Sequence, residues 1–542
     1  MNKGESVYAG CLDTRKAFDT VWIRGLLYKL YETGIDAKIW RIIEKAYTGF
    51  QCAVVVAGQQ GEWFNTERGV HQGAPLSMWL YMIFINDLIK DLRVCGYGAV
   101  MGNISIASPC HADDVIVLTI HKKGLNSMFK ICEKYSNEWR YEYNMKKTKC
   151  LLWGKDKEPN VKIEMNGKEI DIVKSCKHVG VQLCTIRHER KLDCQKRAGK
   201  ARGVLLAARG RGSAQVPVPP TVLSKIYWSG GIPKMVYGLD VTPIDEANMQ
   251  ILETQHCQNA KIVQGVPSNV PNPAPLATVG WLSISSYISL MQIMFIFRTL
   301  CSQYDNVYKR IMILVLRDCI IGKEGNMDGP TSRMYKSAER YGVAGHIQNM
   351  IENNSYGELD KWKKLVKDAV WGKEVIKWKA TCMLYGETLS MYLQGVLDIG
   401  THPWLLVVKS QPRTGKLVSG ILSILMGSQP CKLQCDYRGR CRLCLTYEKD
   451  TATHILMKCP SLENTRRVMY AKVLDSMPRA MAEDITNMGD GERVNILMNA
   501  LNCRYNKEWQ NIYESIAAWV HESYKERRRL YDNLDIEVGL GL

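Results

Sequence analysis

The sequence has no uninterrupted apolar run of about 18 residues, the length that a membrane-spanning helix requires. The closest stretch, residues 287–297, is too short and ends at Arg298, so we expect a buried helix there. The N-terminus lacks the charged and then apolar pattern of a signal peptide. Internal repeats and low-complexity tracts are also absent from the sequence. These absences argue against a membrane-spanning, secreted or repeat protein.

The composition is that of a globular protein with a polyanionic partner. The chain has 542 residues, of which 46% are hydrophobic, enough for about three domains with cores of their own. Its 72 basic and 54 acidic residues leave a net charge of +18, which favours nucleic acid as the partner, with a membrane surface as the alternative. The 19 cysteines, an odd number without a secretory signal, indicate reduced thiols and an intracellular location, nuclear or cytoplasmic.

Three aspartates form the most informative pattern. Asp113 and Asp114 stand between the apolar runs 104–107 and 115–120, an arrangement typical of strand, tight turn and strand. Asp13 follows a further apolar run, residues 8–12, and could lie at the end of a neighbouring strand. Adjacent carboxylates repel each other unless they share a cation, so the pattern indicates a site for two magnesium ions. The alternative is that Asp113 and Asp114 only occupy a turn, where acidic residues are common.

Five blocks in a fixed order decide between these interpretations, because together they resemble the reverse transcriptases of non-LTR retrotransposons. They are residues 12–22 (LDTRKAFDTVW), 68–88 (RGVHQGAPLS and the helix after it), 111–114 (HADD), 144–148 (NMKKT) and 177–181 (KHVGV). The resemblance implies a polymerase palm that performs RNA-directed DNA synthesis. Two positions depart from the family pattern: His111 replaces the usual Tyr or Phe, and Met78 replaces the usual Pro.

The resemblance also implies a role for several side chains. Asp13 and Asp113 would ligate two Mg²⁺ ions, and Asp114 would contribute to the same charge cluster. Lys147 would neutralise or protonate the leaving pyrophosphate; the alternative is a solvated lysine among its basic neighbours.

The substrate residues implied by the resemblance are Phe18, Gln72 and Gly73. Phe18 would form the floor of the sugar pocket and exclude a ribose 2′-hydroxyl, although without Asp13 nearby it would count as an ordinary core aromatic. Gln72 and Gly73 would contact the incoming base and the template, since glycine lets the backbone approach closely. The implied partners are an RNA template, a DNA primer and deoxynucleoside triphosphates.

The blocks begin only twelve residues into the chain. Full-length relatives carry fingers and an endonuclease domain before the palm, so we interpret the sequence as a truncated copy of a longer element, the alternative being a gene model begun at an internal methionine. We expect it to polymerise poorly or not at all on its own, because the surface that holds the triphosphate is missing.

The predicted fold class is α+β: a right-hand reverse transcriptase palm without fingers, followed by a mainly helical thumb and C-terminal region with a small zinc module. The expected domains are the palm at 1–184, a thumb-like region at 185–280, a helical region of unknown role at 281–428, the zinc module at 429–470 and a helical tail at 471–542. Residues 187–211 contain nine basic and two acidic residues. Lys196, Arg197, Lys200 and Arg202 are the candidates for phosphate contacts, the alternative being a solvated basic helix face.

A second site is indicated near the C-terminus. Cys441, Cys444, His454 and Cys459 have a spacing that suits tetrahedral zinc, and similar modules end many non-LTR elements. Cys435 and, more weakly, Cys431 are competing ligands, and coincidental thiol pairs are the alternative. Four protein ligands would make this zinc structural, and its basic flanks make RNA or target-DNA binding plausible.

The sequence therefore predicts a non-LTR reverse transcriptase. An intron-encoded maturase or a telomerase is the rival within the same enzyme class. Two further alternatives are a non-catalytic nucleic-acid-binding remnant of such an element and a zinc-stabilised interaction protein whose palm is only a scaffold. Neither of these two proteins would incorporate nucleotides in a magnesium-dependent reaction, as the enzyme would.

Overall fold

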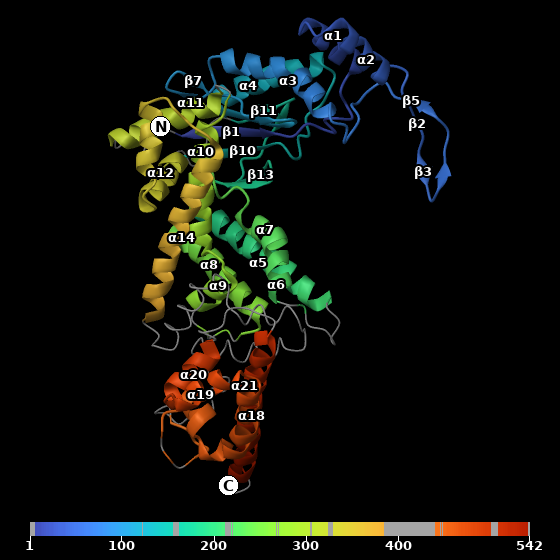
Figure 1. Cartoon of the computed structure of the whole chain (residues 1–542). Coiled ribbons are helices and arrows are strands. Elements are labelled where there is room, and N and C mark those ends of the chain that lie inside the picture. The colour runs from blue at the N-terminus through green and yellow to red at the C-terminus, as the bar shows by residue number, and fades with distance from the viewer. Residues whose placement is uncertain are drawn as a thin grey trace. The chain divides into compact units, whose positions relative to one another are not determined.

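A computed structural model describes residues 6–539 except 122, 155–161, 212–217, 219, 267, 269, 271, 304–305, 323–328, 384–439, 445, 447 and 500–507. The chain divides into two compact units (Figure 1). Unit 1 contains residues 1–193 and 302–332, and unit 2 contains residues 194–301 and 333–542. Among the described residues no helix is both long and apolar enough to cross a membrane.

Unit 1 is built on a four-stranded antiparallel sheet with the strand order β10-β1-β9-β8. The central strands alternate little in polarity because both faces are covered: all six residues of β1 are buried. The core behind the sheet includes Phe84 of α3 and Phe129 of α4, both almost fully buried. The sheet strands are β1 (Val7–Leu12), β8 (Cys110–His111), β9 (Asp114–Thr119) and β10 (Lys149–Trp153).

Helices and short hairpins complete unit 1. The helices are α1 (Ile23–Glu32), α2 (Ala37–Tyr47), α3 (Ser77–Val94), α4 (Gly124–Glu138) and α11 (Val307–Ile321). The hairpins are β2 (Gln51–Cys52) with β5 (Phe64–Asn65), β3 (Val55–Val56) with β4 (Gln59–Gln60), β6 (Val100–Met101) with β7 (Ile104–Ser105), β11 (Glu164–Met165) with β12 (Lys168–Glu169), and β13 (Ser175–His178) with β14 (Val181–Cys184).

One strand differs from the sequence-based expectation. The apolar run 104–107 does not lead directly into the aspartate turn, because Ile104–Ser105 pairs with Val100–Met101 in a hairpin of its own. The strand before the turn is instead β8, only two residues long. The run was misleading because Ile104 and Ala107 are buried in the core although no residue of the run belongs to a strand of the main sheet.

Helix α5 (Arg187–Arg211) begins in unit 1 and continues into unit 2, where the described residues are mainly helical. The other helices are α6 (Pro220–Ile226), the π-helical segment η1 (Tyr227–Gly231), α7 (Ile232–Val236), α8 (Glu246–Gln264), α9 (Pro273–Val279), α10 (Ile284–Leu300), α12 (Pro330–Arg340), α13 (Ala344–Glu352), α14 (Leu359–Met383), η4 (His454–Lys458), η5 (Pro460–Leu462), α18 (Glu463–Asp475), α19 (Arg479–Asn487), α20 (Asp490–Asn499) and α21 (Glu508–Gly539). The expected buried helix over residues 287–297 is confirmed as part of α10, with Ile293 and Phe297 fully buried.

Candidate functional site

The three aspartates come from two neighbouring strands of the sheet in unit 1. Leu12, the last residue of β1, pairs with Val115 of β9. Asp13 therefore follows β1 at the point where Asp114 begins β9, and both side chains are half-buried. The antiparallel register alone brings together two carboxylates that are a hundred residues apart in the sequence.

Asp113 lies in the tight turn that joins β8 to β9. His111 pairs with Asp114, which leaves Ala112 and Asp113 as the two turn residues, and Ala112 has a positive φ of 53°. Two-residue hairpin turns require such a backbone conformation. Burial raises the pKa of the Asp113 carboxyl, and the charges of Asp114 and Asp13 raise it further. The smaller part of this shift, from the two neighbouring carboxylates, is the repulsion that a bound cation would relieve.

The block at residues 144–148 is positioned against Asp13. The Asp13 backbone N–H donates to the hydroxyl of the fully buried Thr148 at 3.3 Å, and the Asn144 N–H donates to the Asp13 carbonyl at 2.7 Å. Lys147 Nζ lies 3.8 Å from the Asp13 carboxylate. These two hydrogen bonds hold residues 144–148 against Asp13, so the exposed Lys147 ammonium lies beside the carboxylate cluster.

Phe18 and the Gln72–Gly73 loop also lie together. The Val70 N–H donates to the Phe18 carbonyl at 2.8 Å, and the Phe18 ring packs 5.2 Å from the Tyr81 ring. Gln72 Nε2 donates to Asp19 Oδ1 at 2.7 Å, and Gly73 has a positive φ of 82°. The loop is therefore held to the segment that follows Asp13.

Sequence reasoning did not single out the residues that hold these groups in place. Gly69 is one of them: at its φ of 97°, a Cβ atom would lie 3.0 Å from the Asp19 carbonyl oxygen. Thr148 is another, because its hydroxyl contacts Asp13 from a buried position. Both belong to the motif blocks, but their roles depend on contacts with distant segments that the blocks do not specify.

The hairpin β13–β14 lies close to the three-aspartate cluster. Burial lowers the pKa of His178, whose ring feels the charges of Asp114 and His111. Cys176 Sγ on β13 lies 3.2 Å from Cys11 Sγ on β1. The fifth block, residues 177–181, forms the tip of this hairpin, with Val179 and Gly180 at its turn.

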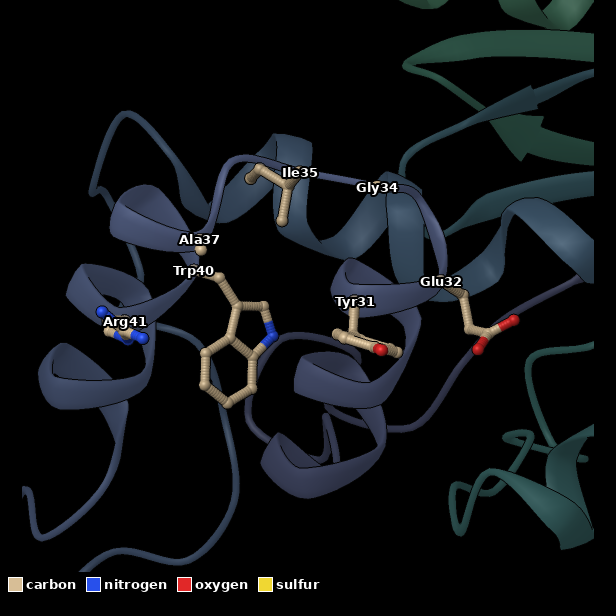
Figure 2. Close-up of a pocket in the computed structure, with 7 residues that line it drawn as sticks. All are labelled: Tyr31, Glu32, Gly34, Ile35, Ala37, Trp40 and Arg41. Atoms are coloured by element: carbon tan, nitrogen blue, oxygen red, sulfur yellow. The ribbon is translucent and has the colours of Figure 1, made fainter.

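A hollow of about 620 Å³ lies between α1 and α2 of unit 1. Figure 2 shows Tyr31 and Trp40 beside it, with Glu32 and Arg41 on either side. The Trp40 indole N–H donates to the Leu27 carbonyl at 2.8 Å, which fixes the ring. The sequence-derived site residues do not line this hollow, and we assign it no function.

The second predicted site also assembles. Cys441, Cys444, His454 and Cys459 are all buried, and their ligand atoms lie within 4.8 Å of one another. The donor set of three sulfurs and one imidazole suits zinc. The neighbouring Cys459 thiol lowers the pKa of Cys441 to about 4, which favours the thiolate that a metal requires. The competing candidates Cys431 and Cys435 lie outside the described residues.

Surrounding contacts orient the histidine and attach the cluster to α21. His454 Nδ1 lies 3.0 Å from a carboxylate oxygen of Glu448, so Nδ1–H donates there and Nε2, 3.3 Å from Cys444 Sγ, keeps its lone pair for a metal. A fully buried ion pair joins Asp450 to Arg527 of α21. With four protein ligands, a bound zinc would be structural.

The basic residues of α5 differ in exposure. Lys196, Lys200 and Arg202 are exposed. Arg197 is buried, and its guanidinium donates to the Tyr237 carbonyl at 2.7 Å. Three of the four candidates therefore remain available to contact phosphates.

Residues 1–183 match the family model described as reverse transcriptase (RNA-dependent DNA polymerase). This part of the chain is a reverse transcriptase domain, in agreement with the sequence-based prediction. The similarity of this domain to proteins of the R2 and jockey elements supports the non-LTR retrotransposon type expected from the sequence.

Three of these relatives illustrate the similarity. The first is a retrovirus-related Pol polyprotein from type-1 retrotransposable element R2 of Nasonia vitripennis, 29% identical over 163 residues, which are 30% of this chain and 16% of the relative. RNA-directed DNA polymerases from mobile element jockey follow: that of Drosophila funebris is 28% identical over 184 residues (32% and 20% of the two chains), and that of Drosophila melanogaster is 24% identical over 279 residues (49% and 29%). The matched part of this chain thus corresponds to less than a third of each relative's length.

Proposed function

We propose that the chain is an RNA-directed DNA polymerase of a non-LTR retrotransposon, which adds deoxynucleotides to a DNA primer on an RNA template. The observation that carries the proposal is the meeting of Asp13, Asp113 and Asp114 at the ends of β1 and β9. Lys147 and Gln72 come from two other blocks, and both contact the segment that carries Asp13 and Phe18.

The carboxylates fit a pair of Mg²⁺ ions, because oxygen ligands are what Mg²⁺ prefers and because their mutual repulsion needs a cation. When bound, the ions would stabilise the attacking and leaving oxygens of phosphoryl transfer. Lys147 would neutralise or protonate the pyrophosphate, and Phe18 would exclude the 2′-hydroxyl of a ribonucleotide. Gln72 and Gly73 would hold the base and template.

Two further regions would hold nucleic acid. Lys196, Lys200 and Arg202 on α5 would contact backbone phosphates of the primer–template duplex without reading its sequence. The zinc module would be a folded support whose exposed Arg442, Lys458 and Arg467 bind RNA or target DNA. We also propose a nuclear or cytoplasmic location, where such templates occur and thiols stay reduced.

Primer extension tests this proposal. The full chain is incubated with a labelled DNA primer on an RNA template, deoxynucleotides and Mg²⁺, and is compared with Asp113→Asn. Incorporation that requires Mg²⁺ and is lost in Asp113→Asn supports the polymerase even if it is weak, and robust incorporation would contradict the reduced activity expected from the sequence. Salt-dependent binding of the primer–template without any incorporation would favour the non-catalytic nucleic-acid-binding alternative instead.

A further inference from the structure

A cavity of about 290 Å³ in unit 2 is lined by none of the residues assigned to the two sites described above. Its walls include Trp228 of η1, Tyr287 and Met294 of α10 and Trp371 of α14. Helices α10 and α14 pack against each other along this region (Figure 1). The cavity is slightly smaller than the roughly 300–1,000 Å³ of pockets that take a whole drug-sized ligand, so it suits a single flat ring system.

Aromatic rings give this cavity its shape. The Trp228 and Tyr287 rings lie 5.1 Å apart at an interplanar angle of 83°, so they form two perpendicular walls. The fully buried Trp281 holds Trp228 from behind at 6.1 Å, also at 83°. Fixed aromatic walls favour a planar ligand, because little side-chain entropy is lost when it stacks.

Two lysines supply the only charge among the residues that line the cavity. Lys363 and Lys367 are one helical turn apart on α14 and are exposed. Within the described part of the chain neither forms an ion pair with an acidic side chain. Their ammonium groups are therefore available to an anion at the edge of the cavity.

We propose that this cavity binds one unpaired nucleotide of single-stranded nucleic acid, with its base against the aromatic walls and its phosphate at Lys363 and Lys367. Stacked aromatics combined with cations are how proteins hold single strands without reading sequence. An aromatic pocket with a cationic edge matches a nucleotide better than it matches an acidic peptide, which would leave the rings unused. The inference rests on the proposed function in one respect, which is that the chain must bind nucleic acid.

Binding of fluorescent single-stranded 12-mers to the full chain, measured by anisotropy without Mg²⁺ or deoxynucleotides, tests the proposal. Trp228→Leu keeps an apolar side chain but removes the ring, and it should weaken binding roughly tenfold, within the range expected for one stacked base. Lys363→Ala/Lys367→Ala should reduce the slope of log affinity against log salt by about 1.4, because each phosphate contact to a single strand contributes about 0.7. RNA and DNA 12-mers of one sequence show which strand the pocket prefers.

The matched control is Lys361→Ala/Lys379→Ala, which removes the same charge from exposed positions of the same helix that do not line the cavity. The control should keep the salt slope of the unchanged protein. Equal losses in both double variants would overturn the proposal, because they would show only a general dependence on charge.

Photocrosslinking locates the base directly and does not depend on how well Trp228→Leu folds. A 12-mer with 5-iodouracil should crosslink to a peptide that contains Trp228, Tyr287 or Trp371. Crosslinks confined to other regions would refute the proposal. The finding that another protein fills the cavity would also refute it. Since Asp113→Asn should crosslink normally, loss of polymerase activity alone leaves this result unaffected.

Discussion

Lys147 Nζ lies 3.8 Å from the carboxylate of Asp13, at the edge of the three-aspartate cluster. Lys147 is 70% exposed and Asp13 only 35%, so the lysine can follow a substrate while the aspartate stays fixed. We expect Lys147→Ala to slow nucleotide incorporation about 100-fold with little change in KM, because a positioned proton donor contributes at least that much. Single-turnover incorporation measures the effect.

Lys146 is the matched control for this prediction, since it is an exposed lysine directly before Lys147 and has no ion pair among the described residues. Lys146→Ala should leave the rate nearly unchanged. If both variants slow the reaction equally, Lys147 acts only as one of several solvated charges.

Phe18 predicts the sugar selectivity of the enzyme. Its ring packs against Tyr81 at 5.2 Å, which holds it in place on the segment after Asp13. Phe18→Ala should reduce the preference for deoxynucleotides over ribonucleotides, by up to about 100-fold, because the steric exclusion of one hydroxyl is lost. The ratio of kcat/KM for the two substrates measures this. Phe64→Ala, at a half-exposed ring on β5, should not change the ratio.

The Cys441, Cys444, His454 and Cys459 cluster predicts one zinc ion per chain, measurable by elemental analysis of the purified protein. Cys444→Ser should lose the metal and lower the melting temperature, because the free energy of binding a structural zinc contributes to the free energy of folding. A strong chelator should have the same effect on the unchanged protein.

Cys52→Ser is the control for the zinc prediction, since Cys52 is a free, half-buried thiol of unit 1. It should bind zinc normally. Full zinc occupancy in Cys444→Ser would show that another residue completes the site.

His256 predicts a pH dependence of stability. Burial lowers the pKa of His256 to about 4, and its ring is neutral with Nε2–H donating to the Leu282 carbonyl at 3.0 Å. The unfolded chain has a histidine pKa of about 6.5, so it binds a proton more readily than the folded protein below that pH. The free energy of unfolding should therefore fall by about 3 kcal/mol as the pH drops from 6.5 to 4.

Chemical unfolding of His256→Gln over the same pH range is the comparison. The variant should be less stable at neutral pH, because the Tyr227 hydroxyl and the Leu282 carbonyl lose an imidazole that fits both. Its free energy of unfolding should fall less steeply from pH 6.5 to 4. An unchanged slope would mean that His256 is protonated in the folded state.

Local patterns predicted the parts of unit 1 whose partners are close in sequence. The pair Asn166–Gly167 is a typical hairpin-turn sequence, and the structure has a hairpin there with φ values of 51° and 68°. The apolar run that ends at Leu12 predicted the strand that positions Asp13. In both cases alternation or turn chemistry within a few residues is sufficient.

Contacts between distant segments could not be predicted in this way. Lys29 lies in the amphipathic helix α1, and its side chain is buried on the apolar face, with Nζ 3.7 Å from the Trp139 ring centroid and 3.2 Å from an Asp87 carboxylate oxygen. The aromatic cavity of unit 2 combines three helical segments more than fifty residues apart. Helical periodicity predicts which face of each segment is buried, but it does not predict which other segment packs against that face.

The central claim is that Asp13, Asp113 and Asp114 together hold the divalent ions of a polymerase centre. Titration of the full chain with Mn²⁺, followed by electron paramagnetic resonance, tests this claim without requiring catalysis. The account predicts saturable Mn²⁺ binding that Mg²⁺ displaces and that is strongly weakened in both Asp13→Asn and Asp113→Asn. Equal Mn²⁺ binding by the unchanged protein and both variants would contradict it.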